Sequence, residues 1–270
     1  MSLNYKLNHR FQEKDERDYT YSVKMDETHK LEIITKTAKG VTTTTTQTPK
    51  TSATFSISNL PSIVNQGKIG SCTANAFYFT VMQQTKNQIP LSRLFLYANC
   101  RCLDNTPLNQ DNGTYVRTVC NAILNYGVCK ETVYPYITTN FANFPPLTSY
   151  KNSNQFKKFT YTFLAQNIAT MKNCLTTYNV PIVFGFMVYS SFMSNTVSTT
   201  GVAPMPNTKT ETLEGGHCAC IVGYDDTAQR FTCANSWGTS WGNKGYFTIP
   251  YTYLTNTSLA SDFCFTTFVY

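Results

Sequence analysis

The sequence predicts an α+β protein built from two lobes that face each other across a cleft. Segments with helical spacing of apolar residues cluster between residues 71 and 126, and apolar runs typical of strands follow between residues 181 and 270. This separation, without alternation of strands and helices, is the pattern of α+β folds. A chain of 270 residues with 41% hydrophobic residues is long and apolar enough for one large domain or two lobes.

Three helices are expected in the first half of the chain. Residues 71–86 start at Ser71, a residue type that often caps a helix, and they are apolar enough to be buried. Residues 91–102 carry four apolar side chains at helical spacing, which favours packing in the core over a binding surface. Residues 114–126 end at Gly127, a typical helix stop.

The second half is expected to hold one helix, at residues 168–178, which crosses between the lobes. Residues 138–158 and 190–211 are rich in polar and turn-forming residues and are predicted to be irregular. Strands are predicted at residues 181–188, 219–224, 230–235, 245–250 and 263–270.

The first 54 residues form an N-terminal arm of different composition. Residues 1–50 carry nine Lys or Arg and seven Asp or Glu, a much higher density of charge than the rest of the chain. Residues 31–35 favour a short strand or helix, and the Thr-rich residues 36–53 are predicted to be an extended linker. We therefore divide the chain into an arm, residues 1–54, and a body, residues 55–270.

The charge and hydropathy patterns argue against several classes of partner. The formal net charge of +7 comes from scattered basic residues, without a basic helix or stripe, so no nucleic acid is expected as a partner. No apolar run approaches 18 residues, and residues 1–20 lack the apolar centre of a secretory signal. We expect a monomer with no membrane contact, and the compartment stays open among cytoplasm, virion and an endolysosomal route.

The ten cysteines do not indicate a metal site. Cys100-x-Cys102 and Cys218-x-Cys220 have shorter spacers than zinc sites usually have, and no histidine is spare for them. Because no secretory signal is seen, the sequence does not fix a disulfide pattern. Neither a metal nor a cofactor is expected.

One stretch, residues 66–76, has the features of a nucleophile site. Gly67 and Gly70 loosen a loop that leads into the first helix, and Cys72 lies at the turn. A thiol in the first turn is close to unpaired backbone N–H groups and to the positive end of the helix dipole, which lower its pKa. Taken alone, the pattern fits a small buried cysteine equally well.

A cysteine nucleophile usually needs an imidazole as its base, and the sequence offers one candidate. Of the three histidines, His9 and His29 lie in the arm. His217 follows a pair of glycines at the start of an apolar strand in the body. By itself, His217 is also explained as a core histidine bonded to a backbone carbonyl.

A third segment, residues 233–249, supplies a partner for that imidazole. It contains both tryptophans, Trp237 and Trp241, interleaved with glycines. The side-chain oxygen of Asn235 can accept a hydrogen bond from an imidazole N–H, and a neighbouring indole can keep water away from that bond. The alternative is a glycine-rich surface hairpin with aromatic packing.

Together the three segments resemble the papain-like cysteine peptidases, the cathepsin-type C1 family. The order Cys, His, Asn is shared, and His217 and Asn235 follow Cys72 by 145 and 163 residues, against roughly 130–150 in the family. The most specific match is Asn-Ser-Trp-Gly-x-x-Trp-Gly-x-x-Gly-Tyr, which is complete at residues 235–246. Gly-Gly-His is similar to cathepsin B, whereas Ser-Cys-Thr-Ala-Asn-Ala is closer to short microbial or viral members.

The resemblance implies a papain-like two-lobe fold, with the active site in the cleft between the lobes. The helical lobe would comprise about residues 66–165, and an antiparallel β-barrel-like lobe about residues 166–270. In such peptidases an N-terminal segment commonly lies across the cleft. The arm is therefore a candidate pro-segment that would occupy the cleft of its own chain. The alternative for the arm is a tail that packs against the body for stability.

The resemblance also implies a mechanism, hydrolysis of peptide bonds through an acyl-enzyme. Cys72 would be the nucleophile, and His217 would hold it as a thiolate and later protonate the leaving amine. Asn235 would orient the imidazole and Trp237 would shield their contact. The Gln66 side chain, six residues before the cysteine, and the Cys72 backbone N–H would stabilise the oxyanion.

Substrate contacts follow from the same resemblance. Gly113 would bond the backbone of an extended peptide, and Asp262 would admit a basic side chain in the pocket for the second residue before the cut. The body has no second histidine of the occluding-loop type, so endopeptidase activity is favoured. The residues expected to contact substrate are Gly113, Tyr115, Val116, Gly185, Gly216 and Ser261 or Asp262.

Two departures from the family pattern leave other functions open. Ile69 and Asp111 replace both halves of a family disulfide, and Thr73 stands where tryptophan usually follows the nucleophile. Because Thr73 is much smaller than tryptophan, the sequence does not show how this part of the cleft wall is formed. The alternatives are transglutaminase-type acyl transfer, which uses a similar Cys–His pair, and a non-catalytic papain-fold protein that binds peptides.

Overall fold

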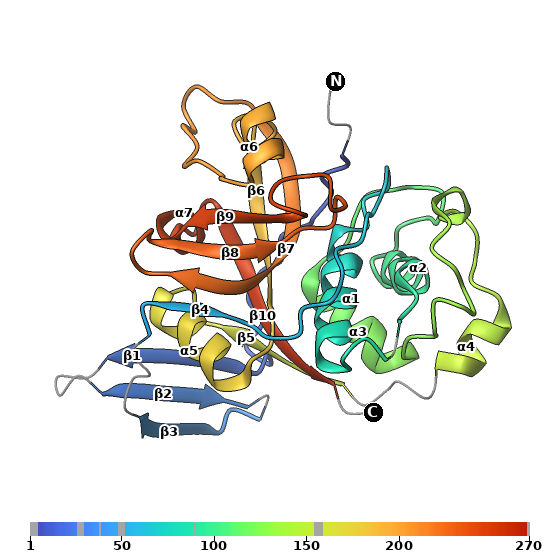
Figure 1. The fold of residues 1–270 in the computed structure, drawn as a ribbon. Coiled ribbons are helices and arrows are strands. Elements are labelled where there is room, and N and C mark those ends of the chain that lie inside the picture. The colour runs from blue at the N-terminus through green and yellow to red at the C-terminus, as the bar shows by residue number, and fades with distance from the viewer. Residues whose placement is uncertain are drawn as a thin grey trace.

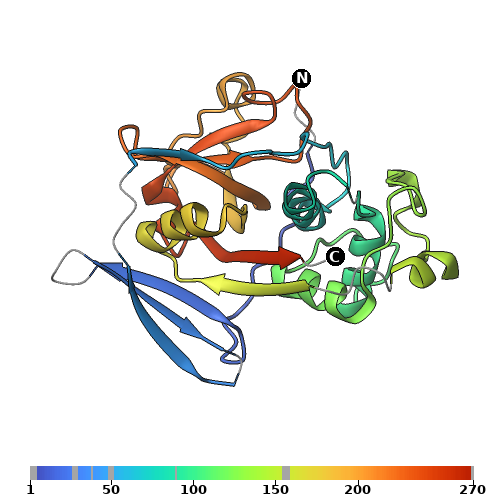
Figure 2. The same cartoon turned by 60° about the horizontal axis from the view of Figure 1, so that its bottom comes forward.

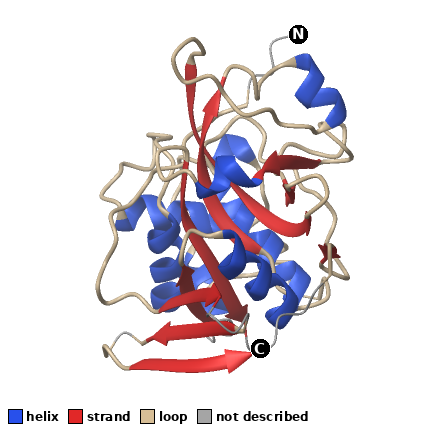
Figure 3. Ribbon diagram, turned by 90° about the vertical axis from the view of Figure 1, so that its left-hand side faces the viewer, coloured by secondary structure: helices blue, strands red, loops and turns tan. Residues whose placement is uncertain are grey.

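The structure, a computed structural model, describes residues 5–25, 30–37, 39–47, 52–88, 90–153 and 159–268. The helices between residues 72 and 153 gather on one side of the molecule, and the strands lie on the other side together with the helices that follow residue 167 (Figure 1). Residues 8 and 9 of the arm pair with strand and loop residues of both sides. Long loops join the elements over the outside of the molecule (Figure 3). The predicted α+β two-lobe fold is confirmed.

The β lobe is organised by a ten-stranded sheet within the described part of the chain. The strand order is β3-β2-β1-β5-β10-β6-β7-β8-β9, and β4 pairs with β7. Every pairing is antiparallel except that of β1 with β5. The strands of the body are β4 (Thr54–Ser56), β5 (Phe159–Leu164), β6 (Ile182–Tyr189), β7 (Leu213–Asp225), β8 (Arg230–Ala234), β9 (Tyr246–Pro250) and β10 (Ala260–Phe268).

The helices of the first half begin and end within a few residues of the predicted positions. The first of them, α1, packs against α2 and α3 on one side and against β6, β7 and β10 on the other, which explains why it is apolar around its circumference. The helices are α1 (Cys72–Gln84), α2 (Arg93–Leu103), α3 (Val116–Tyr126), α4 (Leu147–Ser153), α5 (Ile168–Tyr178), α6 (Asn195–Thr200) and α7 (Tyr251–Thr255), with a 3-10 turn at Thr138–Asn140.

The arm contributes three strands that the sequence did not fully reveal. They are β1 (Thr20–Met25), β2 (Leu31–Lys36) and β3 (Thr42–Gln47), and they lie together at one edge of the molecule (Figure 2). The threonine run expected to be a linker is β3, because it pairs along its whole length with β2. β1 continues the main sheet through β5 and buries Tyr21 and Val23 almost completely.

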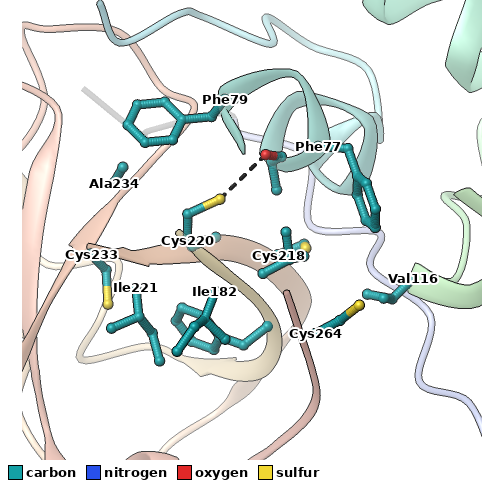
Figure 4. Close-up of a cluster of buried hydrophobic side chains, with 14 of the residues drawn as sticks. Phe77, Phe79, Val116, Ile182, Cys218, Cys220, Ile221, Cys233, Ala234 and Cys264 are labelled. Atoms are coloured by element: carbon teal, nitrogen blue, oxygen red, sulfur yellow. Dashed lines mark hydrogen bonds between the residues drawn. The ribbon is translucent and has the colours of Figure 1, made fainter. Parts of the chain in front are cut away.

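The two lobes share a core beneath the cleft. Figure 4 shows this core, where aromatic side chains of α1 lie over small and branched side chains of the sheet. The Cys220 thiol of β7 donates a hydrogen bond to the Ala76 carbonyl of α1 at 3.3 Å (Figure 4). This contact fixes the strand that carries His217 against the helix that carries Cys72. Within the described residues, no helix is long and apolar enough to cross a membrane.

Candidate active site

Cys72 is the first residue of α1, where the loop of residues 66–71 turns into the helix. Ser71 stands at the N-cap position, as predicted, but its hydroxyl makes no capping bond to the helix. The Ser71 hydroxyl instead lies 2.5 Å from the Tyr136 hydroxyl and accepts from the Asn75 side chain at 3.0 Å. These contacts tie the start of the helix to the loop that carries Tyr136.

His217 and Asn235 come together because β7 and β8 are neighbours in the sheet. Asn235 follows the last residue of β8, and its Oδ1 accepts a hydrogen bond from His217 Nε2 at 2.8 Å. The Trp237 ring lies 4.7 Å from the imidazole, and only 1% of Trp237 is exposed. The indole therefore keeps water away from the His217–Asn235 bond, as the sequence pattern predicts.

Gln66 is held in a fixed orientation in the loop that leads to Cys72. Its side chain is fully buried, its Nε2 donates to the Ile69 carbonyl at 3.0 Å, and its Oε1 accepts from the Ser236 hydroxyl at 2.7 Å. The backbone N–H of Gln66 also donates to the Ser236 carbonyl at 2.8 Å. Sequence reasoning missed Ser236, although its place between Asn235 and Trp237 was a usable signal.

A carboxylate takes over the bracing of the cysteine loop where the family disulfide is absent. Asp111 accepts from the Gly70 backbone N–H at 2.9 Å and from the Tyr97 hydroxyl at 2.5 Å. The Lys6 ammonium of the arm lies 2.7 Å from the same carboxylate. Asp111 therefore holds the loop by hydrogen bonds in the place where a covalent bridge is missing.

The N-terminal arm crosses this site. The His9 backbone N–H donates to the Gly216 carbonyl at 2.8 Å, and the Arg10 N–H donates to the Thr114 carbonyl at 3.3 Å. Gly113 has a φ of +73°, and a Cβ placed on it would lie 1.4 Å from the Asn8 carbonyl oxygen. Only glycine permits so close an approach of the two backbones.

The His9 side chain fills a pocket lined by both lobes. Its Nε2 lies 3.1 Å from the Asp262 carboxylate and its Nδ1 lies 3.2 Å from the Thr73 hydroxyl. A Cβ on Gly185 would lie 2.0 Å from His9 Nε2, so the pocket needs a glycine there. Asp262 sits at an irregularity in β10 with a φ of 61°, and this local change of strand geometry turns its carboxylate toward the pocket.

The residues before His9 contact the remaining parts of the site. The Tyr5 ring stacks on Trp237 at 4.2 Å with the rings nearly parallel. The Lys6 carbonyl accepts from Gln66 Nε2 at 3.3 Å. The arm thus touches the predicted oxyanion donor, the shielding indole and the pocket at the same time.

Five of the six predicted substrate contacts lie against the arm. Gly113, Gly185, Gly216 and Asp262 contact Asn8 or His9, and the Arg10 guanidinium lies 4.2 Å from the centre of the Tyr115 ring. The sixth, Val116, is fully buried and belongs to the core of Figure 4. The Ser261 hydroxyl is buried and has no hydrogen-bond partner among the described residues.

With the arm in place, Cys72 and His217 are both fully buried and both uncharged at neutral pH. Burial raises the pKa of the Cys72 thiol to about 11, although N–H groups of Cys218, Thr73 and Asn8 act in the opposite direction. Burial also lowers the pKa of His217 to about 4, against the opposing effect of its bond to Asn235. The expected low thiol pKa is therefore wrong for this closed arrangement, because desolvation outweighs the helix N-terminus.

The thiol and the imidazole are not hydrogen-bonded in the closed arrangement. Within the described part of the chain, His217 Nδ1 has no hydrogen-bond partner. Because Asn235 already engages Nε2, Nδ1 is the nitrogen left to face a thiol. Asn235 therefore orients the imidazole, and Nδ1, the nitrogen that would act on the Cys72 thiol if the predicted pair is correct, has no partner among the described residues.

No metal centre is formed by the residues that the structure describes. They contain no cluster of three or more His, Cys, Asp or Glu side chains arranged to hold an ion. All ten cysteines carry free thiols; Cys100 is buried, and Cys102, two residues on, is exposed.

Comparison with known proteins identifies the class of this molecule. The sequence profile of the papain family cysteine proteases matches residues 49–266. An uncharacterized peptidase C1-like protein of Acanthamoeba polyphaga mimivirus is 38% identical over 213 residues, which cover 74% of this chain and 68% of the viral protein. A cathepsin B-like protein, CP2 of Giardia intestinalis, is 26% identical over 70% of this chain and 63% of its own length.

The similarity extends to a solved structure. Xylellain, a cysteine protease from Xylella fastidiosa, has a TM-score of 0.80 and 30% sequence identity, and the match covers 98% of this chain and 96% of xylellain. The chain therefore belongs to the papain family of cysteine peptidases, hydrolases that cut peptide bonds.

Proposed function

We propose that this protein is a cysteine endopeptidase that uses Cys72 and His217 and is held inactive by residues 5–11 of its own chain. The proposal rests on one observation: the arm occupies the predicted oxyanion donor and the predicted substrate pocket at the same time. The Lys6 carbonyl takes the Gln66 donor, and the His9 side chain takes the pocket with Asp262. A peptide substrate has no access to either group until this segment leaves.

Departure of residues 5–11 restores the conditions for the reaction. Water then reaches Cys72 and His217, so the desolvation that keeps both groups neutral is relieved. Cys72 transfers its proton to His217 Nδ1, and the resulting thiolate attacks the peptide carbonyl. Gln66 Nε2 and the Cys72 backbone N–H stabilise the oxyanion, which is worth about 3–4 kcal/mol for each donor in comparable sites.

The second half of the reaction uses the same imidazole. His217 protonates the leaving amine, an acyl-enzyme forms on Cys72, and water hydrolyses the thioester. Asn235 keeps the ring aligned through both steps because its bond to Nε2 does not depend on the state of Nδ1. Trp237 protects that bond from water.

The direction in which the arm runs predicts that the enzyme does not cut it within the cleft. A substrate places its acyl part toward the Asp262 pocket and its leaving amine toward His217 and Trp237. The arm runs the other way, because its earlier residue, Tyr5, lies on Trp237 and its later residue, His9, lies in the Asp262 pocket. The backbone is therefore reversed relative to the orientation that cleavage requires.

The pocket supports a preference for a basic side chain at the second residue before the cut. The Asp262 carboxylate is 5% exposed and faces the His9 ring nitrogen. A buried carboxylate selects for a side chain that donates hydrogen bonds or carries positive charge. Of the alternative functions, transglutaminase-type transfer and non-catalytic peptide binding are disfavoured by the match to peptidases over most of the chain.

The proposal is tested by comparing the full-length protein with a variant that lacks residues 1–11. We expect the shortened protein to cleave a library of internally quenched peptides, with Arg or Lys enriched two residues before the cut. The full-length protein should be at least tenfold slower. The shortened forms of Cys72→Ala and His217→Ala are the matched controls and should be inactive. Equal activity with and without residues 1–11 would contradict autoinhibition, and C-terminal dipeptide trimming would contradict the endopeptidase assignment.

A further inference from the structure

The N-terminal arm consists of two parts that are attached to the body in different ways. The tip, residues 5–11, lies in the cleft and makes the contacts described above. The anchor, residues 18–25, enters the sheet as β1. A loop of residues 12–17 joins the two parts.

The anchor is part of the folded body. Asp18 is 7% exposed and pairs with Arg117 of α3 at 2.6 Å. Tyr21 is buried and its hydroxyl donates to Asn173 of α5. The Val23 backbone N–H donates to the Thr170 hydroxyl at 2.8 Å. Removal of the anchor would expose this core and leave the edge of β5 unpaired.

The connecting loop is different, because little holds it to the body. Glu13, Lys14, Glu16 and Arg17 are exposed. Arg17 bonds within the loop, to Asp15. The loop stands over a cavity of about 640 Å³ that separates it from side chains of β5 and β10. Exposed loop segments with few contacts to the body are the preferred places for proteolytic cleavage.

The ends of the loop are clamped while its centre is open. Arg117 donates from its backbone to Gln12 Oε1 at 2.8 Å and from its guanidinium to the Glu13 carbonyl at 3.0 Å. On the far side of the loop, Asp18 binds the same guanidinium. A cut between residues 13 and 18 therefore leaves Asp18 and the following strand in place.

We propose that residues 13–17 are a proteolytic processing site, and that one cut there activates the enzyme while residues 18–47 remain a permanent part of it. The proposal rests on the proposed autoinhibition by residues 5–11. The cut is a hydrolysis: water adds across one peptide bond, the C–N bond breaks, and a new carboxylate and a new ammonium group form. The processed enzyme thus begins within this loop and keeps β1, β2 and β3.

A single cut is enough to activate the enzyme because it breaks the covalent connection between the tip and the body. While the chain is intact, the tip faces the cleft at an effective concentration on the order of millimolar. After the cut, the tip is a free peptide at the much lower concentration of the protein itself. Dilution then releases the tip, and the contacts of the anchor are unaffected.

The test uses the full-length protein and a Glu-specific endoprotease, which cuts after Glu13 and Glu16. Intact mass and N-terminal sequencing identify each product, and peptide hydrolysis is measured on the same samples. We expect activity to rise at least tenfold as products beginning at Lys14 or Arg17 appear. The matched control, Glu13→Gln with Glu16→Gln, should stay intact at this loop and inactive. A synthetic peptide of residues 1–13 should inhibit the processed enzyme in a concentration-dependent way.

Two deletion variants separate the two proposals. The form that lacks residues 1–13 should be active and folded, and the form that lacks residues 1–53 should melt roughly 10 °C or more lower. If the deletion of residues 1–13 gives no activity, autoinhibition fails. If that deletion is active but cleavage in the loop does not activate, or activity appears only in products that begin at residue 48 or later, the processing site fails. Equal melting temperatures of the two deletions would overturn the permanent role of residues 18–47.

Discussion

Substitution of His9 by alanine isolates the contribution of the Asp262 pocket to closure of the cleft. The imidazole is buried, with Nε2 at 3.1 Å from Asp262 and Nδ1 at 3.2 Å from Thr73. A hydrogen bond to a charged partner contributes about 1.5–3 kcal/mol, and one to a neutral partner about 1 kcal/mol. Water that enters the emptied pocket offsets part of this loss. His9→Ala should therefore reduce the free energy that favours the docked arm by roughly 3 kcal/mol, which lowers the ratio of closed to open molecules by a factor on the order of 100.

The assay is the rate at which an epoxide that alkylates activated thiols labels Cys72 in the full-length protein. Cys72 is fully buried when the arm is docked, so labelling reports the open fraction. We expect His9→Ala to raise the rate by one to two orders of magnitude, up to the rate of the protein that lacks residues 1–11. Glu16→Ala, an exposed position of the same arm, should leave the rate within twofold. If Cys72 is labelled at the same rate in His9→Ala as in the wild type, while the protein lacking residues 1–11 is labelled fast, then the contacts of His9 in the Asp262 pocket do not hold the arm in place.

Three further predictions follow from named contacts. Because burial lowers the pKa of His217 to about 4, its contribution to stability is complete above about pH 6.5 and is lost as pH falls toward 4. The free energy of unfolding of the full-length protein, measured by denaturant titration, should fall by on the order of 3 kcal/mol over that range. In His217→Gln the free energy of unfolding should depend much less on pH between 6.5 and 4. In the form lacking residues 1–11, Asp262→Asn should lower kcat/KM at least tenfold for peptides with a basic side chain at the second residue before the cut, and should change it little for peptides with an apolar side chain there. If the ratio of these two kcat/KM values does not change, Asp262 does not determine specificity. Asp111→Ala should destabilise the loop of Gly70 by about 1–3 kcal/mol, because a buried N–H loses its acceptor, and faster hydrogen exchange at Gly70 would report it.

The catalytic candidates were predictable because their signal is local. Cys72 follows a glycine loop at a helix start, and Asn235 and Trp237 lie in one short motif, so each segment carries its own pattern. The three helices of the first half were also found, because apolar spacing within a helix depends on near neighbours.

Three short helices, α4, α6 and α7, were missed, two of them in segments predicted to be irregular. The strands β1 and β3 of the arm were missed for another reason, because they depend on partners elsewhere in the chain. The threonines of β3 form a strand because β2 is beside them, and β1 is ordered by β5, about 140 residues later. The high pKa of Cys72 comes from its complete burial, which no property of the helix start indicates. The bracing of Gly70 by Asp111 likewise appears only when the two loops are seen together.

The proposed peptidase activity requires Cys72 and His217 to react as a pair once the tip of the arm has left. The most direct measurement is mass spectrometry of the protein lacking residues 1–11 after brief exposure to the epoxide at neutral pH. We expect one adduct, located on Cys72, and at least a hundredfold slower labelling in His217→Ala. Labelling of Cys72 at the same rate in His217→Ala, or no labelling of Cys72 at all, would contradict it.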